Sequence, residues 1–197
     1  LALFSVGLSA VGLSAVGLSA APTQAQPTAT DSLGREVGAP PYPILFLHGL
    51  DGSDDTWKEM IGRLQSRWGE SQVLNFNLNA DGDESTCTIS GDVFYEGSSL
   101  HDGNLYAMNF ALSSTSNTAA IVKQGKALSE SIERILEATG EEKVVLVGHS
   151  MGGLAIREYL QRRDVAGSPR WWVNPVQNSG HRVARVVTLG TPHFGSN

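Results

Sequence analysis

Residues 148–152 have the residue types and spacing that nucleophilic catalysis by a serine requires. They read Gly-His-Ser-Met-Gly, follow the apolar run 144–147, and precede a helical pattern that starts at Met151. A G-x-S-x-G sequence between a strand and a helix predicts a tight, strained turn that exposes the serine hydroxyl, with glycines where side chains would collide with backbone. Ser150 is therefore the candidate nucleophile for acyl transfer.

Acyl transfer also needs two N–H donors aimed at the oxyanion that develops on the carbonyl. The N–H of Met151 begins the helix after the serine, where the positive end of the helix dipole lies. The second candidate is the N–H of Leu50, in the turn His-Gly-Leu-Asp-Gly-Ser at 48–53. This turn ends the apolar run 43–47, and ligands of a doubly wound sheet lie beyond the carboxyl ends of such strands. The alternative is a strand-to-helix turn without a catalytic role.

The remaining patterns predict an α/β fold with a mostly parallel, doubly wound sheet. Apolar residues recur at helical spacing after each motif and again over 119–138, with Gly140 at the carboxyl end of that helix. Apolar runs at 72–78 and 185–190 predict two further strands. Strand, helix and strand in succession imply right-handed crossovers and therefore a parallel sheet.

Residues 79–117 are the least regular part of the sequence, which indicates a functional loop, a lid or a disordered segment. Asp81, Asp83, Ser85 and Asp92 are spaced much as in a calcium loop. The sixth position of that loop holds threonine instead of the required glycine, so we expect a solvated acidic loop and no metal site.

Charge and cysteine content limit the function classes. The 197 residues carry a net charge of −6 without a block of like charges, so nothing favours a nucleic-acid partner. The single cysteine, Cys87, cannot form an internal disulfide, and the fold must therefore depend on packing.

The first residues differ in composition from the rest. Residues 1–21 carry no charged side chain and contain Val-Gly-Leu-Ser-Ala three times in succession. We interpret 1–25 as part of a secretory signal peptide with a small-residue cleavage site at 23–25; a transmembrane anchor is the alternative. Residues 26–41 then form a flexible leader, and 42–197 the folded domain. This organisation predicts a secreted protein, or one in the periplasm or cell envelope.

Three motifs in this order resemble the α/β-hydrolase superfamily, and more narrowly its lipases and esterases. They are Leu-His-Gly-Leu-Asp-Gly-Ser at 47–53, Gly-His-Ser-Met-Gly-Gly at 148–153 and Leu-Gly-Thr-Pro-His-Phe-Gly-Ser at 189–196. Bacterial triacylglycerol lipases and the GPI-inositol-deacylase-like group carry the same trio. The resemblance extends over about residues 42–197.

The resemblance implies an α/β-hydrolase fold in which Ser150 is the nucleophile. The N–H groups of Leu50 and Met151 would form the oxyanion hole, and His149 would be the variable residue of the turn rather than the base. It also implies an acyl ester or lipid as substrate, peripheral contact with lipid surfaces, and no metal or organic cofactor.

The sequence departs from the family in the rest of the catalytic triad. The family order is serine, then acid, then histidine, and the candidates after Ser150 are Glu158, Asp164, His181 and His193. The two acids lie in or just past a helix that leads away from the site. The histidine of the Thr-Pro-His motif lines the site in the family without serving as base, although a pairing of Asp164 with either histidine stays open.

We therefore expect the acid and base to lie beyond Asn197, and the domain to be incomplete at its carboxyl end. The intact protein is expected to hydrolyse carboxylic esters through an acyl-enzyme, and this portion alone to be inactive. A thioesterase or amidase on the same fold, and a secreted binding protein that has lost the triad, are the alternatives.

Overall fold

The structure, a computed structural model, describes residues 29–30, 36–78, 93–95, 99–110, 120–172 and 181–195. In chain order the elements are β1 (Ala29–Thr30), β2 (Glu36–Val37), β3 (Ile44–Leu47), the 3-10 turn η1 (Asp54–Trp57), α1 (Lys58–Trp68), β4 (Ser71–Leu78), β5 (Val93–Tyr95), β6 (Leu105–Asn109), α2 (Ile121–Thr139), β7 (Val144–His149), α3 (Met151–Gln161) and β8 (Val183–Leu189).

The main sheet of the described residues has the order β5-β4-β6-β3-β7-β8. The strands from β4 to β8 in this order run parallel to their neighbours, and only β5 is antiparallel, against β4. The expected parallel α/β sheet is confirmed. Strands β1 and β2 pair separately in a short antiparallel ladder.

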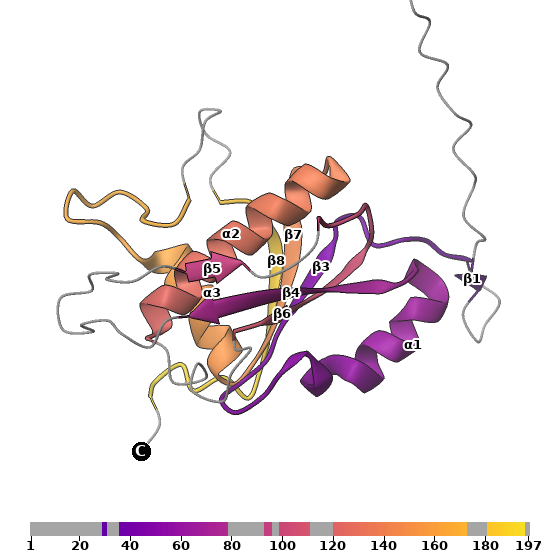
Figure 1. Cartoon of the computed structure of the whole chain (residues 1–197), viewed down its shortest axis with the longest axis horizontal. Helices are drawn as coiled ribbons and strands as arrows, with labels where there is room; N and C mark the ends of the chain where they lie inside the picture. The colour runs from indigo at the N-terminus through magenta and orange to yellow at the C-terminus, as the bar shows by residue number, and fades with distance from the viewer. Residues whose placement is uncertain are drawn as a thin grey trace, which may run out of the picture.

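Helices cover the two faces of the sheet: α1 lies on one side and α2 with α3 on the other (Figure 1). Alternation along the central strand β3 explains this, because successive side chains of a strand point to opposite faces. Leu45 and Leu47 belong to the core beneath α2 and α3, whereas Phe46 packs with Trp57 and Ile61 on the α1 side.

One central strand differs from expectation. Strand β6 lies within residues 79–117, which the sequence marks as irregular, yet it is inserted between β4 and β3 with every residue buried. Its five residues, Leu-Tyr-Ala-Met-Asn, include no β-branched side chain, and Tyr106 alone has a high β propensity, so burial in the sheet is what makes the segment a strand. The acidic positions considered for calcium, Asp81, Asp83, Ser85 and Asp92, lie outside the described residues.

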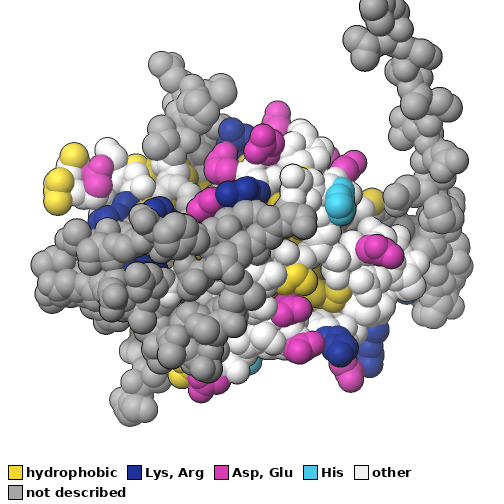
Figure 2. All heavy atoms as spheres, in the orientation of Figure 1, with side chains coloured by type: hydrophobic (Ala, Val, Ile, Leu, Met, Phe, Trp, Pro, Cys, Tyr) yellow, Lys and Arg dark blue, Asp and Glu magenta, His cyan; other side chains and the backbone are white. Residues whose placement is uncertain are grey.

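Charged side chains of both signs are interspersed over the face shown in Figure 2, in keeping with the absence of charge blocks in the sequence. Within the described part of the chain, no helix combines the length and apolarity needed to cross a membrane.

Candidate active site

The sharp turn predicted at residues 148–152 is present between β7 and α3. Ser150 adopts φ 51° and ψ −118°, a left-handed conformation that non-glycine residues rarely take. Such strain of about 1–3 kcal/mol persists only where the surroundings hold the residue in place. The N–H of Ser150 donates to Leu189 O at 2.8 Å, and its carbonyl accepts from Gly153 N at 3.1 Å. The candidate nucleophile is therefore held from two sides.

The glycines of the turn are required by close contacts with backbone. A β-carbon on Gly148 would lie 2.7 Å from Gly153 N, and one on Gly152 would lie 2.6 Å from the carbonyl oxygens of both Leu47 and His48. Because these neighbours are main-chain atoms, they cannot move aside as a flexible side chain could. The turn thus packs directly against the end of β3.

The structure brings the two glycine-rich motifs together at one edge of the sheet. Leu47 is paired with Gly148 across β3 and β7, so the loop that follows β3 starts beside the turn. A β-carbon on Gly49 would lie 2.9 Å from the β-carbon of Ser150 and 3.1 Å from His149 Nδ1. Leu50, next in the chain, exposes 58% of its surface. The loop therefore lies against the candidate nucleophile, as the oxyanion-hole interpretation requires.

Both candidate oxyanion donors are free in the described part of the chain. Neither the N–H of Leu50 nor that of Met151 donates to another described group. Met151 is the first residue of α3, where backbone N–H groups have no partner within the helix. An incoming carbonyl oxygen could accept from such groups without displacing an internal bond.

His48 holds residues 48–54, the candidate oxyanion loop, although sequence alone assigns it no role. Its side chain is fully buried, Phe110 N–H donates to Nε2 at 3.2 Å, and Nδ1 lies 2.7 Å from Gly49 O. A ring nitrogen that accepts cannot carry a proton, so the imidazole is neutral and Nδ1–H donates to Gly49 O. Burial lowers the pKa of His48, with smaller opposing effects of the Gly49 carbonyl and Asp54. The neutral form is thus favoured.

Hydrogen bonds between Asp54 and Asn109 also hold residues 48–54 to the end of β6. Asn109 Nδ2 donates to Asp54 Oδ1 at 2.8 Å, and Asp54 N–H donates to Asn109 Oδ1 at 3.2 Å. Just before it, Ser53 Oγ accepts from Asp55 N–H and caps η1. The end of β6 therefore supports residues 48–54, the segment that carries Leu50.

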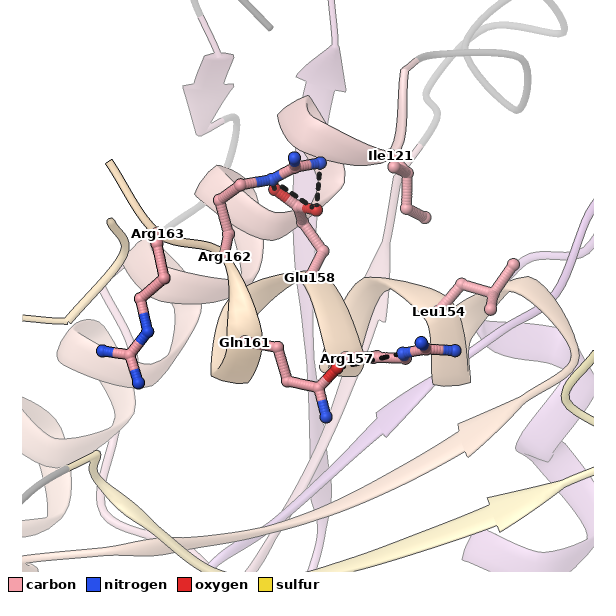
Figure 3. A pocket seen from close by; sticks show the side chains of 7 residues that line it. All are labelled: Ile121, Leu154, Arg157, Glu158, Gln161, Arg162 and Arg163. Carbon is pink, nitrogen blue, oxygen red and sulfur yellow. Dashed lines mark hydrogen bonds and ion pairs between the residues drawn. The ribbon is translucent and has the colours of Figure 1, made fainter. Parts of the chain in front are cut away.

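The acidic candidates for the triad are engaged elsewhere. Glu158, in α3, is bound through both carboxylate oxygens by Arg162 at 2.8 Å, as Figure 3 shows. It also accepts from Trp171 Nε1 at 3.1 Å. Asp164 Oδ1 accepts the N–H groups of Ala166 and Ser168, both at 2.9 Å, within its own turn. These bonds give both carboxylates structural roles.

The histidine candidates are likewise not directed at the nucleophile. His181 Nδ1 accepts from Val183 N–H at 3.3 Å, and His193 Nε2 lies 3.3 Å from Thr188 Oγ1. Among the described residues, none hydrogen-bonds the Ser150 hydroxyl or pairs a carboxylate with either histidine. The structure therefore joins the turn and the oxyanion loop, but does not join either to an acid–histidine pair.

Known proteins are similar to this chain in sequence and fold. The model of a family described as alpha/beta hydrolase of unknown function (DUF915) matches residues 35–166. Triacylglycerol lipases of Pseudarthrobacter phenanthrenivorans and Burkholderia plantarii are each 29% identical to the chain over 164 residues, which is 80% of this chain and 35% and 31% of the respective lipases. The chain thus spans about a third of the length of these curated relatives.

Among solved structures, the product of the lin2722 gene from Listeria innocua has the same fold. It matches with a TM-score of 0.52 at 22% sequence identity, over 79% of this chain and 53% of that chain.

Proposed function

The chain belongs to the alpha/beta hydrolase family DUF915, and from that premise we propose that Ser150 is the nucleophile of a carboxylic-ester hydrolase. The observation that carries the proposal is the meeting of two segments at one edge of the sheet. Gly49 lies against the strained Ser150, and the unbonded N–H groups of Leu50 and Met151 flank this contact. Acyl transfer needs a nucleophile and donors to the oxyanion, and these residues are candidates for both.

In the proposed reaction, Ser150 Oγ attacks the acyl carbonyl while a general base takes the hydroxyl proton. The carbonyl oxygen becomes an oxyanion that accepts from the N–H groups of Leu50 and Met151, each contributing about 3 kcal/mol to the transition state. The alcohol leaves with the proton, and water then releases the acid from the acyl-enzyme. The general base and its acid partner are proposed to lie outside the described residues.

Lipid esters are the proposed substrate class. Two relatives at 29% identity are named triacylglycerol lipase. Apolar side chains also lie exposed on the loops that follow β3 and β8, namely Leu50 and Phe194. Exposed apolar side chains on loops at the carboxyl ends of the parallel strands favour an acyl chain and contact with a lipid surface. The uncharged apolar residues 1–21 support export from the cytoplasm as part of the same proposal.

Active-site labelling of the full-length protein tests this function. A fluorophosphonate probe should label the wild-type protein at Ser150, and the Ser150→Ala variant should remain unlabelled at equal folded concentration. A panel of ester, thioester and amide substrates of graded chain length should then show the highest kcat/KM for esters. Well-folded wild-type protein that resists the probe would refute the nucleophile, and a preference for thioesters or amides would refute the ester class.

A further inference from the structure

The loop that follows β8 contacts the helix that carries the oxyanion donor. It starts at Gly190 and ends at Gly195, both in left-handed conformations with φ of 59° and 97°. Immediately before it, Leu189 O accepts the N–H of Ser150. Thr191 lies so close to Gly153 that a β-carbon on the glycine would overlap the threonine side chain. The end of β8 therefore contacts the nucleophile, and the start of the loop packs against the first turn of α3.

Packing alone does not hold the rest of the loop. His193, Phe194 and Gly195 are exposed, and a cavity of about 430 Å³ separates α3 from β8 and the loop. Thr191 Oγ1 is buried without a hydrogen-bond partner among the described residues. A loop with so little buried apolar surface has a low local free energy of opening unless polar contacts hold it.

Arg157 supplies such a contact. It lies in the second turn of α3, and its Nη1 donates to the main-chain oxygen of His193 at 2.5 Å. Its Nε donates to Gln161 Oε1 at 3.0 Å, as Figure 3 shows. The planar guanidinium is thus held by its own helix while it binds the loop, and hydrogen bonds from a charged donor are roughly twice as strong as neutral ones.

We propose that Arg157 is a positioning residue for the reaction of Ser150. Arg157 fastens His193 to α3, and the fastened loop keeps Thr191 against Gly153 and Leu189 O on the Ser150 N–H. The nucleophile and the N–H of Met151 thereby keep their relative positions. This role rests on the proposed function, because it concerns the geometry of the same serine.

The test compares Arg157→Gln with Arg163→Gln in the full-length protein. Arg163 is an exposed arginine that lines the same side of α3 and has no side-chain partner among the described residues, so it matches the charge change. Arg157→Gln should lower the rate of fluorophosphonate labelling at Ser150 and kcat for a short-chain ester by about 10- to 100-fold, with KM little changed. Arg163→Gln should behave as wild type. Arg157→Lys keeps a charged donor and should recover part of the rate.

Hydrogen exchange gives a readout that does not depend on turnover. In Arg157→Gln the amide of Ser150 and those of residues 190–195 should lose protection, whereas amides in the middle of β7 should keep theirs. If Arg157→Gln does not fold, Thr191→Ala tests the other contact through which the loop acts on α3, the packing of Thr191 against Gly153. This substitution removes no internal hydrogen bond and should still slow labelling.

The outcomes separate the two proposals. Unlabelled wild-type protein would remove the proposed function and this role with it. Labelled wild-type protein together with wild-type rates in folded Arg157→Gln, or in Thr191→Ala where Arg157→Gln does not fold, would overturn the positioning role and leave the nucleophile in place.

Discussion

Gly49 approaches Ser150 so closely that a β-carbon on residue 49 would lie 2.9 Å from the β-carbon of the serine. Real β-carbons do not approach each other this closely, so residue 49 must be glycine for the oxyanion loop and the nucleophile to keep their present separation. This contact joins two motifs that lie far apart in the sequence, and it sets the distance between the serine and the N–H of Leu50.

The Gly49→Ala variant should therefore lose more activity than its loss of stability explains. Displacing the loop moves one oxyanion donor, and loss of one donor costs about 10²- to 10³-fold in kcat. Gly62→Ala is the matched control, because nothing lies within 4 Å of its added methyl group and alanine favours the helix. The measurement is kcat with the melting temperature of each variant; equal activity in the two variants would contradict the assigned loop position.

The backbone conformation of Ser150 predicts that glycine at this position gives a more stable fold than alanine. With φ at 51°, the serine β-carbon is strained, and glycine at the same position is not. Ser150→Gly should unfold with a free energy about 1 kcal/mol greater than that of Ser150→Ala, since both lack the hydroxyl and only alanine retains the β-carbon. Urea unfolding of the two inactive variants measures the difference, and a more stable alanine variant would show that the turn is relaxed.

The neutral, buried His48 predicts a pH dependence of stability. Burial lowers its pKa below the ordinary value of 6.5, so between 6.5 and the lowered value only the unfolded chain takes up a proton here. The free energy of unfolding should therefore decrease as the pH falls through this window, by at most about 1.4 kcal/mol per pH unit from this residue. Above pH 6.5 the contribution is constant.

His48→Gln removes this titration while it keeps a donor and an acceptor on the side chain. Urea unfolding at about pH 7.5 and about pH 5.5 should show a smaller decrease for the variant than for wild type. An equal decrease in both proteins would mean that His48 is not neutral and buried in the native state.

We expect Glu158 to stabilise the fold and to take no part in catalysis. Its side chain is 7% exposed and is bound by Arg162 and Trp171, so Glu158→Gln weakens a buried ionic contact and should cost about 1–3 kcal/mol of stability. Labelling of Ser150 by a fluorophosphonate should keep its wild-type rate in the folded variant. A large loss of labelling without loss of stability would instead identify Glu158 as the catalytic acid.

The sequence predicts the parts of the fold whose signals are local. The apolar runs at 43–47 and 72–78, the turn at 148–152 and the amphipathic helix at 119–138 all correspond to elements of the structure. Each is specified by neighbours in the chain: an uninterrupted apolar stretch, glycines at fixed spacing, or apolar residues three and four apart. The strand β6 has only the short apolar run 105–108 within an irregular stretch of the sequence, and the sequence therefore does not predict it.

Because β6 is not predicted, the contacts that hold the candidate site to it are not predicted either. His48 bonds Phe110 and Asp54 bonds Asn109, and both partners lie at the end of β6. The contacts of Thr191 with Gly153 and of Arg157 with His193 depend likewise on how β8 lies beside β7. Spacing within a sequence cannot specify such contacts, because they are set by the order of strands in the sheet.

The hydrogen bond from Ser150 to Leu189 makes the reactive turn dependent on a strand that is synthesised after it. During folding, the strained turn cannot become rigid until β8 has paired with β7, because contacts distant in sequence form at a larger cost in chain entropy than local ones. The nucleophile should accordingly acquire native geometry later than the helices, whose hydrogen bonds are local in sequence. Pulsed hydrogen exchange during refolding should show the Ser150 amide protected later than the amides of α2.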